Sequence, residues 1–381
     1  MLKREKFLAR VKQQLQIHPI CAILGPRQCG KTTLALQVAE EGGFVQRHHF
    51  DLENPEDLAS LENPLRVLGE LTGLIIIDEI QRLPDLFPIL RVLVDRNRDK
   101  ARYLILGSAS RDLIQQSSET LAGRIGYVEL TPFQLNEHTE VNTLLVRGGF
   151  PLSYLARSDH ESVLWREAYI QTFLERDIPN LGFRIPPARL RRFWLMLSHV
   201  HGQLLNMHDL SNSMDISNTT VKHYIDILAG TFMVRVLQPW FVNIQKRQIK
   251  TPKIFFRDSG LLLSLLSINS HEALLRNPKL GAVWEGFALE QIINTANLRS
   301  EDVFFWRTSN GAELDLLILH NGEYIGFEFK FSDAPKTTKS MHQALQDLNL
   351  KHLYVIYPGQ RKIFLADKIT AIGLADWHLN L

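Results

Sequence analysis

A glycine-rich loop near the N-terminus places the strongest constraint on the fold of this chain. Residues 25–32 read GPRQCGKT and fit the pattern G-x-x-x-x-G-K-[ST]. The apolar run Pro19–Leu24 precedes the loop, and the helical pattern Thr33–Ala39 follows it. Glycines let backbone N–H groups approach phosphate oxygens, and the helix N-terminus adds partial positive charge. The pattern therefore predicts a strand–loop–helix unit that binds a nucleoside triphosphate.

A second motif supplies the carboxylates that such a site needs. The apolar run Leu74–Ile77 ends in Asp78 and Glu79. The first carboxylate is placed to hold Mg²⁺ together with the Thr32 hydroxyl, and the second to orient or deprotonate the attacking water. Taken alone, the two carboxylates would also suit an acidic helix cap. Together with the loop, they predict hydrolysis of a nucleoside triphosphate with Mg²⁺.

Further residues are candidates for the same site. Lys31 is expected to reach the β- and γ-phosphates. Ser108 follows the apolar run Leu104–Leu106 and is a candidate to sense the γ-phosphate or to position water. Arg124 is a candidate to supply charge to a neighbouring subunit's γ-phosphate, although a lone arginine is more often a surface residue. The predicted nucleotide-binding residues are Gly25, Pro26, Arg27, Gln28, Cys29, Gly30, Lys31, Thr32 and Thr33.

Composition and cysteine usage narrow the class of protein. Hydrophobic residues make up 45% and charged residues 22%, which excludes a disordered chain. Two cysteines, Cys21 and Cys29, exclude a disulfide framework and favour a reducing cytoplasm. The N-terminus is charged and no run of 18 apolar residues occurs, so we expect neither a signal peptide nor a membrane span. Because Cys29 lies at a helix N-terminus, thiol-sensitive hydrolysis is a further hypothesis.

Three regions separate by pattern, and 381 residues are enough for three domains. Residues 1–155 alternate short apolar strands with helical patterns, which predicts an α/β domain with a parallel sheet. Residues 156–266 are predicted to be helical and to end in a hairpin. Residues 267–381 carry short strands between helical patterns, at Val303–Trp306, Leu314–Leu319, Tyr324–Phe329 and Leu353–Tyr357.

The middle region is basic, although the whole chain has a formal net charge of only +2. Residues 181–253 hold ten Lys or Arg and three Asp or Glu. Helix spacing puts Val221, Tyr224, Ile225 and Leu228 on a core face. A helix–turn–helix followed by a hairpin predicts a winged helix that contacts DNA, with oligomer contact as the alternative. The predicted DNA-binding residues are Asn218, Thr219, Lys222, His223, Lys246 and Arg247.

A set of polar residues near the C-terminus suggests a metal-dependent phosphodiesterase. Asp315 lies at the start of one strand, and Glu328 and Lys330 lie at the end of the next. Residues two apart on a strand share a face, so a hairpin can gather these three side chains. Glu285, on a helical pattern, is a fourth candidate. Asp315 and Glu328 would hold Mg²⁺ or Mn²⁺, while a solvated hairpin edge is an equally good interpretation of the spacing.

Taken together, these motifs resemble the prokaryotic AAA+-like ATPases that carry a C-terminal domain of unknown function related to the PD-(D/E)xK nuclease fold. The resemblance covers nearly the whole chain. Cys29 is a departure, since relatives usually carry a small apolar residue there. The residues that carry the resemblance are GPRQCGKTT at 25–33, IDEIQRLP at 77–84, GSAS at 107–110, LAGR at 121–124, GGFP at 148–151, ERDI at 175–178, residues 253–260, and Glu285, Asp315, Glu328 and Lys330.

The resemblance implies an AAA+ ATPase that works as a ring-like homo-oligomer, with a hexamer favoured. It also implies a trans-acting role for Arg124, a sensor role for Ser108, a winged helix in the middle region and a nuclease-like motif at Glu285, Asp315, Glu328 and Lys330. The expected function is ATP-driven handling of DNA. Two alternatives stay open, namely a nucleotide-switched signalling or defence ATPase whose winged helix binds protein, and an ATP-regulated nuclease.

Overall fold

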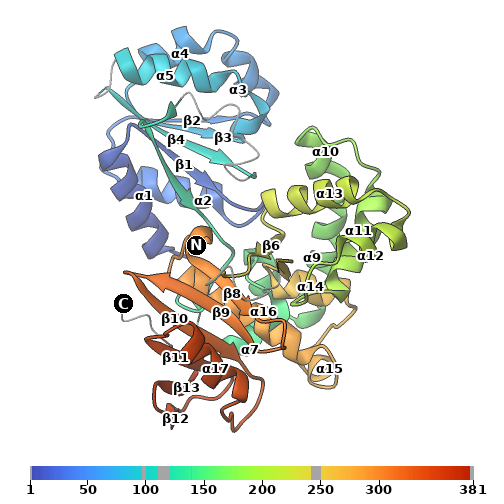
Figure 1. The fold of residues 1–381 in the computed structure, drawn as a ribbon. Coiled ribbons are helices and arrows are strands. Elements are labelled where there is room, and N and C mark those ends of the chain that lie inside the picture. The colour runs from blue at the N-terminus through green and yellow to red at the C-terminus, as the bar shows by residue number, and fades with distance from the viewer. Residues whose placement is uncertain (1, 97–99, 110–120, 139, 242–249, 378–381) are drawn as a thin grey trace. The chain divides into compact units, whose positions relative to one another are not determined.

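The computed structural model describes residues 2–96, 100–109, 121–138, 140–241 and 250–377 (Figure 1). The chain divides into two compact units. Unit 1 comprises Met1–Pro132, Glu175–Ile185 and Gly230–Phe232. Unit 2 comprises Phe133–Leu174, Pro186–Ala229 and Met233–Leu381. The division into three domains at residues 155 and 266 stays a prediction. In the two units, residues 133–155 group with unit 2 and residues 175–185 group with unit 1.

Unit 1 is built on a five-stranded sheet in the order β2-β3-β4-β1-β5, in which all neighbouring strands are parallel. This arrangement confirms the predicted parallel α/β sheet. The three strands that the sequence predicts in this region, Pro19–Leu24, Leu74–Ile77 and Tyr103–Leu106, all form, each within one or two residues of these bounds. The five strands are β1 (Ile20–Leu24), β2 (Arg47–Asp51), β3 (Gly73–Asp78), β4 (Ala101–Gly107) and β5 (Ile125–Glu129).

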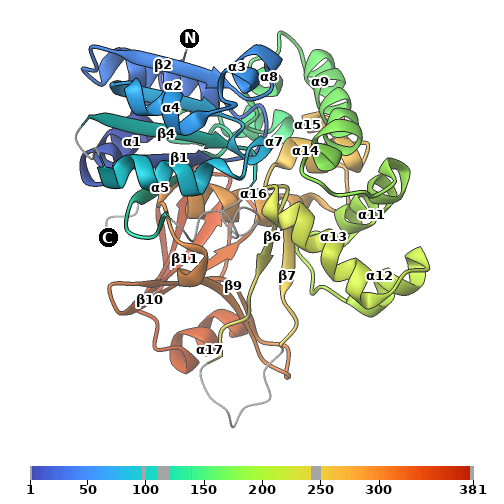
Figure 2. The ribbon, with the colours of Figure 1, turned by 90° about the horizontal axis from the view of Figure 1, so that it is seen from above.

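Helices cover both faces of this sheet, which explains why its inner strands β1 and β3 are apolar and buried along nearly their whole length. Alternate residues along each strand point to opposite faces, so Ile23 and Ile76 pack in a different core from Ala22 and Ile77. The first core includes side chains of α1 (Glu5–Ile17) and α2 (Lys31–Glu41). The second includes side chains of α3 (Pro55–Ser60), α4 (Pro64–Glu70) and α5 (Leu86–Arg96), as well as Leu181 from the later segment. In Figure 2, α4 and α5 lie in front of the strands of this sheet.

Unit 2 begins with helices and a two-stranded hairpin. The predicted helix–turn–helix forms as α12 and α13, with Asp215 in the left-handed conformation at the turn. The hairpin pairs β6 with β7 in antiparallel register. Its classification as a winged helix stays a prediction. The elements are α7 (Val141–Arg147), α8 (Pro151–Tyr154), α9 (Asp159–Thr172), α11 (Pro187–His199), α12 (Met207–Met214), α13 (Asn218–Gly230), β6 (Val234–Leu237), β7 (Lys253–Phe256), α14 (Ser259–Leu265) and α15 (His271–Leu275).

Two of the family motifs meet inside unit 2 in a close backbone contact. Gly148 has φ +74°, and an added Cβ there would lie 2.2 Å from Asp258 Oδ1. The buried Asp258 carboxylate accepts hydrogen bonds from the N–H groups of Gly149 at 2.8 Å and Leu261 at 2.9 Å. A Cβ on Gly260 would lie 2.3 Å from the carbonyl oxygen of Arg147. These glycines are therefore required by packing, and they join the start of unit 2 to α14.

The C-terminal part of unit 2 is a mixed six-stranded sheet in the order β12-β13-β11-β10-β9-β8. Neighbours are antiparallel from β8 to β10 and parallel from β10 through β11 to β13. All four strands that the sequence predicts here form. The elements are α16 (Leu280–Thr295), β8 (Val303–Arg307), β9 (Glu313–His320), β10 (Glu323–Phe329), α17 (Lys339–Asp347), β11 (His352–Tyr357), β12 (Ile363–Ala366) and β13 (Ile369–Gly373).

Among the described residues, no helix combines the length and apolar character needed to span a bilayer.

Candidate functional site

The glycine-rich loop joins β1 to α2 in unit 1. Gly25 passes so close to the chain after β5 that an added Cβ would lie 2.1 Å from the carbonyl oxygen of Leu130, so only glycine fits. Gly30 has φ +97° and immediately precedes α2. The buried Lys31 ammonium donates to the carbonyl oxygens of Gly25 at 3.2 Å and Pro26 at 3.0 Å. The cation is thus held at the loop, where phosphate charge would need it. The other predicted contacts, Gln28 and Thr33, lie in the same loop and in the first turn of α2.

A hydroxyl and a carboxylate meet beside this loop. Thr32 Oγ1, in the first turn of α2, donates to Asp78 Oδ2, at the end of β3, at 2.6 Å. Asp78 is only 6% exposed. Burial raises the pKa of Asp78, and the hydrogen bond from Thr32 opposes that rise. Hard oxygen ligands of this kind suit Mg²⁺, so the two residues predicted to hold that ion are placed to do so.

Glu79 directly follows β3 and has φ +54°, an uncommon conformation for a residue with a side chain. Its Oε2 atom accepts a hydrogen bond from Ser108 Oγ at 3.1 Å and another from Gln81 Nε2. Gln81 Nε2 also donates to Ser108 Oγ at 2.9 Å. Ser108 therefore lies beside the predicted base. Gln81 was not among the predicted site residues, although it lies only two positions after Glu79.

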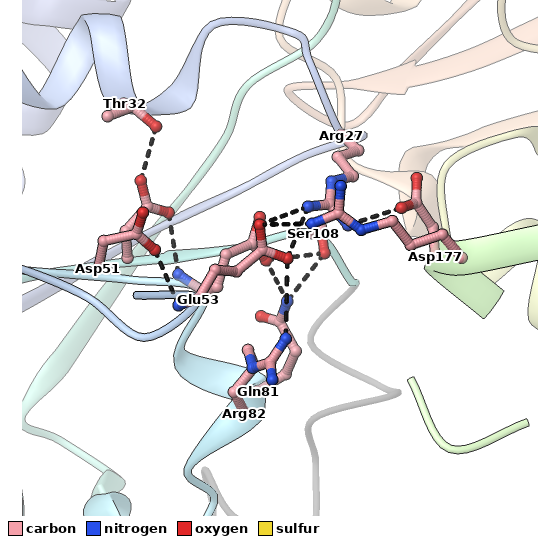
Figure 3. Close-up of polar contacts among 11 residues, drawn as sticks. Arg27, Thr32, Asp51, Glu53, Gln81, Arg82, Ser108 and Asp177 are labelled. Carbon is pink, nitrogen blue, oxygen red and sulfur yellow. Dashed lines mark hydrogen bonds and ion pairs between the residues drawn. The ribbon is translucent and has the colours of Figure 1, made fainter. Parts of the chain in front are cut away.

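A cluster of charged side chains surrounds the third residue of the loop (Figure 3). The Arg27 guanidinium donates to Glu53, after β2, at 2.6 and 2.7 Å, and to Asp177 Oδ1 at 2.6 Å. Glu53 also pairs with Arg176 at 3.2 Å and with Arg82 at 3.9 Å. We call these five residues the Arg27 cluster. All of them belong to unit 1.

Most members of the Arg27 cluster were missed by sequence reasoning. No role was assigned to Glu53, Arg82, Arg176 or Asp177. Arg82 was noted only as part of the family motif at 77–84, and Arg176 and Asp177 only as part of the motif at 175–178. In the structure, Asp177 contacts Arg27 of the loop, and Arg176 contacts Glu53, which is itself a partner of Arg27. The burial of Asp177 raises the pKa of its carboxyl group, and the charge of Arg27 offsets only part of that effect.

Arg124 is engaged within its own chain. Its guanidinium donates to Asp95 Oδ1 at 2.6 Å and to Asp95 Oδ2 at 3.0 Å, at an exposed position. To reach a neighbouring subunit's phosphate, the guanidinium would have to leave this carboxylate. The trans-acting role stays a prediction.

The environment of Cys29 argues against the reactive-thiol hypothesis. The side chain is completely buried, and Sγ donates to the carbonyl oxygen of Leu130 at 3.5 Å. Burial raises the pKa of the Cys29 thiol, so the reactive thiolate is disfavoured. The contribution of Cys29 to the loop is packing.

The predicted DNA-binding face lies on α13 in unit 2. Asn218, Thr219, Lys222 and His223 are exposed. The four predicted core residues on the opposite side of this helix, Val221, Tyr224, Ile225 and Leu228, are buried as expected. Lys246 and Arg247 lie outside the described residues.

A charged pocket of about 650 Å³ gathers the C-terminal candidates. Glu285 on α16, Asp315 on β9, Glu328 on β10 and Lys330 all line it, so the predicted set converges. Lys330 Nζ lies 2.9 Å from Glu328 Oε2. Asp315 Oδ2 accepts a hydrogen bond from the N–H of Phe329 at 2.9 Å. The hairpin of β9 and β10 thus brings carboxylates together as the spacing indicated.

A lysine that was not among the predicted site residues also lines this pocket. Lys253, on β7, is 4% exposed, and its ammonium lies 2.5 Å from Glu313 Oε1, 3.1 Å from Glu285 Oε1 and 4.0 Å from Asp315 Oδ1. Burial alone would lower the pKa of Lys253, but the surrounding carboxylates outweigh it and raise that pKa. The ammonium therefore stays charged and neutralises part of the acidic cluster.

The same burial acts on the carboxylates. Burial, reinforced by the charge of Asp315, raises the pKa of Glu285 and of Glu328 to about 8 in each case. In the described part of the chain, no three carboxylate, imidazole or thiol side chains are grouped in a way that would hold a metal ion. A metal ion bound by Glu285 or Glu313 would compete with the Lys253 ammonium for these carboxylates.

Comparisons with known proteins agree with the ATPase domain predicted for the first region, and they match the other two regions only to domains of unknown function. Residues 17–139 match the family described as an AAA domain. Residues 138–272 match a domain of unknown function (DUF8612), and residues 280–377 match another (DUF4143). A similar solved structure is the Walker-type ATPase PABY2304 of Pyrococcus abyssi, with 14% identity and a TM-score of 0.49 over 70% of this chain and 96% of that one.

Two curated proteins are similar along nearly the whole chain. They are the uncharacterized protein Rv2008c of Mycobacterium tuberculosis (strain ATCC 25618 / H37Rv) and the uncharacterized protein Mb2031c of Mycobacterium bovis (strain ATCC BAA-935 / AF2122/97). Each is 48% identical over 374 residues, which cover 98% of this chain and 84% of the relative. With the glycine-rich loop, the parallel sheet and the matched AAA domain, the chain therefore belongs to the family of these two mycobacterial proteins and carries an AAA-type P-loop ATPase domain.

Proposed function

We propose that this chain hydrolyses ATP to act on DNA as a ring-like homo-oligomer, with a hexamer favoured. The observation that carries the ATPase part is the 2.6 Å hydrogen bond between Thr32 and Asp78, beside the loop that holds Lys31. Thr32 and Asp78 would hold Mg²⁺, which neutralises phosphate charge when it is bound. Lys31 binds phosphate oxygens, and Glu79 takes the proton of the attacking water. Arg124 of a neighbouring subunit supplies further positive charge.

The DNA part of the proposal rests on the middle region. Within it, residues 181–253 carry ten Lys or Arg and three Asp or Glu, and α13 presents polar side chains to solvent on the face opposite its core. Phosphate contacts from Lys222, Lys246 and Arg247 would position this helix on a duplex, and Asn218 or Thr219 would face the base edges.

Duplex DNA is therefore expected to raise the ATP turnover of the purified chain and to bind it with steep salt dependence. Three phosphate contacts give a slope of log K against log salt of about −2.7. Lys222→Glu should weaken binding and reduce that slope. Lys368→Glu, at an exposed position between β12 and β13, is the matched control and should change neither quantity. Salt-insensitive binding, or none, would favour the signalling alternative, in which α13 contacts protein.

A second candidate function, a metal-dependent nuclease, is favoured by the convergence of Glu285, Asp315, Glu328 and Lys330 in one pocket. If the pocket is catalytic, plasmid cleavage in the presence of Mn²⁺ should disappear in Glu328→Gln. The matched control is Glu323→Ala, an exposed position at the other end of β10, which should cleave like the wild type. Cleavage that survives Glu328→Gln would assign the activity elsewhere.

A further inference from the structure

Arg27 stands where a cation can respond to the terminal phosphate of a nucleotide. It is the third residue of a loop whose backbone N–H groups are expected to bind phosphates. Its charge also interacts with that of Glu79, the residue predicted to activate water. In the structure its guanidinium is held instead by two carboxylates, Glu53 and Asp177, at 2.6–2.7 Å. The positive charge of Arg27, which could otherwise bind a phosphate, is therefore paired with these two carboxylates.

The two carboxylates differ in what they would lose if Arg27 moved. Glu53 also pairs with Arg176 and, more distantly, with Arg82, so it would keep a cationic partner. Asp177 is 7% exposed, and Arg27 provides its hydrogen-bonded ion pair. A buried carboxylate that loses its partner is costly. The exchange of Arg27 from carboxylate to phosphate would therefore be opposed mainly by Asp177.

We propose that Arg27 is the residue that distinguishes ATP from ADP, and that Asp177 sets the strength of this discrimination by competing with the γ-phosphate for the Arg27 guanidinium. The inference rests on the proposed binding of ATP at this loop. Because ADP has no γ-phosphate, it leaves Arg27 with Asp177, whereas ATP draws the guanidinium away. Arg27 is a substrate-contacting residue in this scheme, and Asp177 is a positioning residue that acts through it.

The consequence concerns the segment 175–185, which belongs to unit 1 although the chain on both sides of it belongs to unit 2. Asp177 and Arg176 attach this segment to the surroundings of the loop through Arg27 and Glu53. When ATP takes Arg27, the Asp177 contact is released and Arg176 keeps the Glu53 contact. The segment would thus be held differently in the ATP and ADP states.

The test compares the affinities of the full chain for fluorescent ADP and for a fluorescent, non-hydrolysable ATP analogue with an intact γ-phosphate. Asp177→Asn removes the competing charge, so it should tighten the ATP analogue by about tenfold and leave ADP within twofold. Arg27→Gln should weaken the ATP analogue by a similar factor, again with ADP unchanged. Asp85→Asn, an exposed carboxylate just after the family motif at 77–84, is the matched control and should alter neither affinity.

A double-mutant cycle separates this exchange from general electrostatics. In the Arg27→Gln background, Asp177→Asn should have no effect on the ATP analogue, because the competition no longer exists. Equal tightening of ADP and ATP by Asp177→Asn, or weaker ATP binding, would overturn the inference while leaving nucleotide binding intact. A wild-type chain that binds neither nucleotide would instead overturn the proposed function, and the inference with it. Unchanged ADP affinity also reports that each variant is folded.

Discussion

Glu79→Gln is expected to bind ATP within a few-fold of the wild-type affinity and to lower steady-state turnover by at least about 100-fold. The reason is chemical, since the amide keeps the shape of the side chain but cannot accept a proton from water. Ser108 and Gln81 already direct hydrogen bonds at Glu79 Oε2, so the acceptor is held in a defined position. The φ of +54° at Glu79 supports the same assignment, because strained backbone concentrates at functional sites.

The measurement is phosphate release under saturating ATP, together with nucleotide affinity for each variant. Glu70→Gln, in the last turn of α4 and away from the loop, is the matched control and should turn over ATP like the wild type. Ser108→Ala should cost less than Glu79→Gln, because it removes one hydrogen bond and leaves the base itself. Wild-type turnover in Glu79→Gln would remove Glu79 from the role of general base.

The residues of the candidate ATP site whose closeness in space could be predicted from the sequence are those with a local signal. Thr32 lies in the first turn of α2, just after the apolar strand β1, and Asp78 ends the apolar strand β3. Because parallel strands end at one edge of the sheet, the two residues are expected to lie close together. Their 2.6 Å contact follows from that topology. The same holds for Val221 and Leu228, whose burial follows from helix spacing.

The Arg27 cluster has no such signal. Glu53 lies 26 residues from Arg27 and Asp177 lies 150 residues away, and ion pairs between distant residues leave no periodicity in a sequence. A motif such as ERDI at 175–178 shows that residues matter in a family without showing what they touch. The return of residues 175–185 to unit 1 is a tertiary fact that no composition shift announces.

Lys253 was missed for a related reason. The sequence predicted a hairpin at the end of the middle region, and Lys253 lies on its second strand, but membership of a strand does not say what a lysine side chain contacts. Glu285, its partner at 3.1 Å, lies 32 residues further along the chain and in a different element. The carboxylate set was predicted as a candidate metal site, and in the structure the Lys253 ammonium lies within 4.0 Å of Glu285, Glu313 and Asp315.

Lys253→Met is expected to destabilise unit 2 by about 3–5 kcal/mol near pH 8, because Glu285 and Glu313 lose their contact with a buried ammonium, and breaking a buried ion pair is costly. Methionine keeps most of the side-chain volume, so the loss reports charge rather than a cavity. The acidic residues left in the pocket would be Glu285, Glu313, Asp315 and Glu328.

Tryptophan fluorescence during urea unfolding measures this effect selectively, because all six tryptophans belong to unit 2. The matched control is Lys351→Met, an exposed lysine paired with Glu323, which should cost less than about 1 kcal/mol. Adding Glu313→Gln to the Lys253→Met protein restores the original net charge of the pocket, and it should recover part of the lost stability. A Lys253→Met protein as stable as the Lys351→Met control would mean that water, rather than Lys253, compensates the pocket.

The pH dependence of the same variant has a defined sign. The pKa of Glu285 and of Glu328 is raised to about 8 in the folded chain, so both bind protons that the unfolded chain has released. Stability from this source is fully present below the ordinary pKa of 4.5 and is lost as pH rises towards 8. Over that range Lys253 stays charged, because its own pKa is raised above 10.5. Its removal should therefore cost least near pH 5, where the two glutamates carry protons, and most above pH 8, where Glu285 would have to ionise without Lys253 and only Lys330 stays beside Glu328.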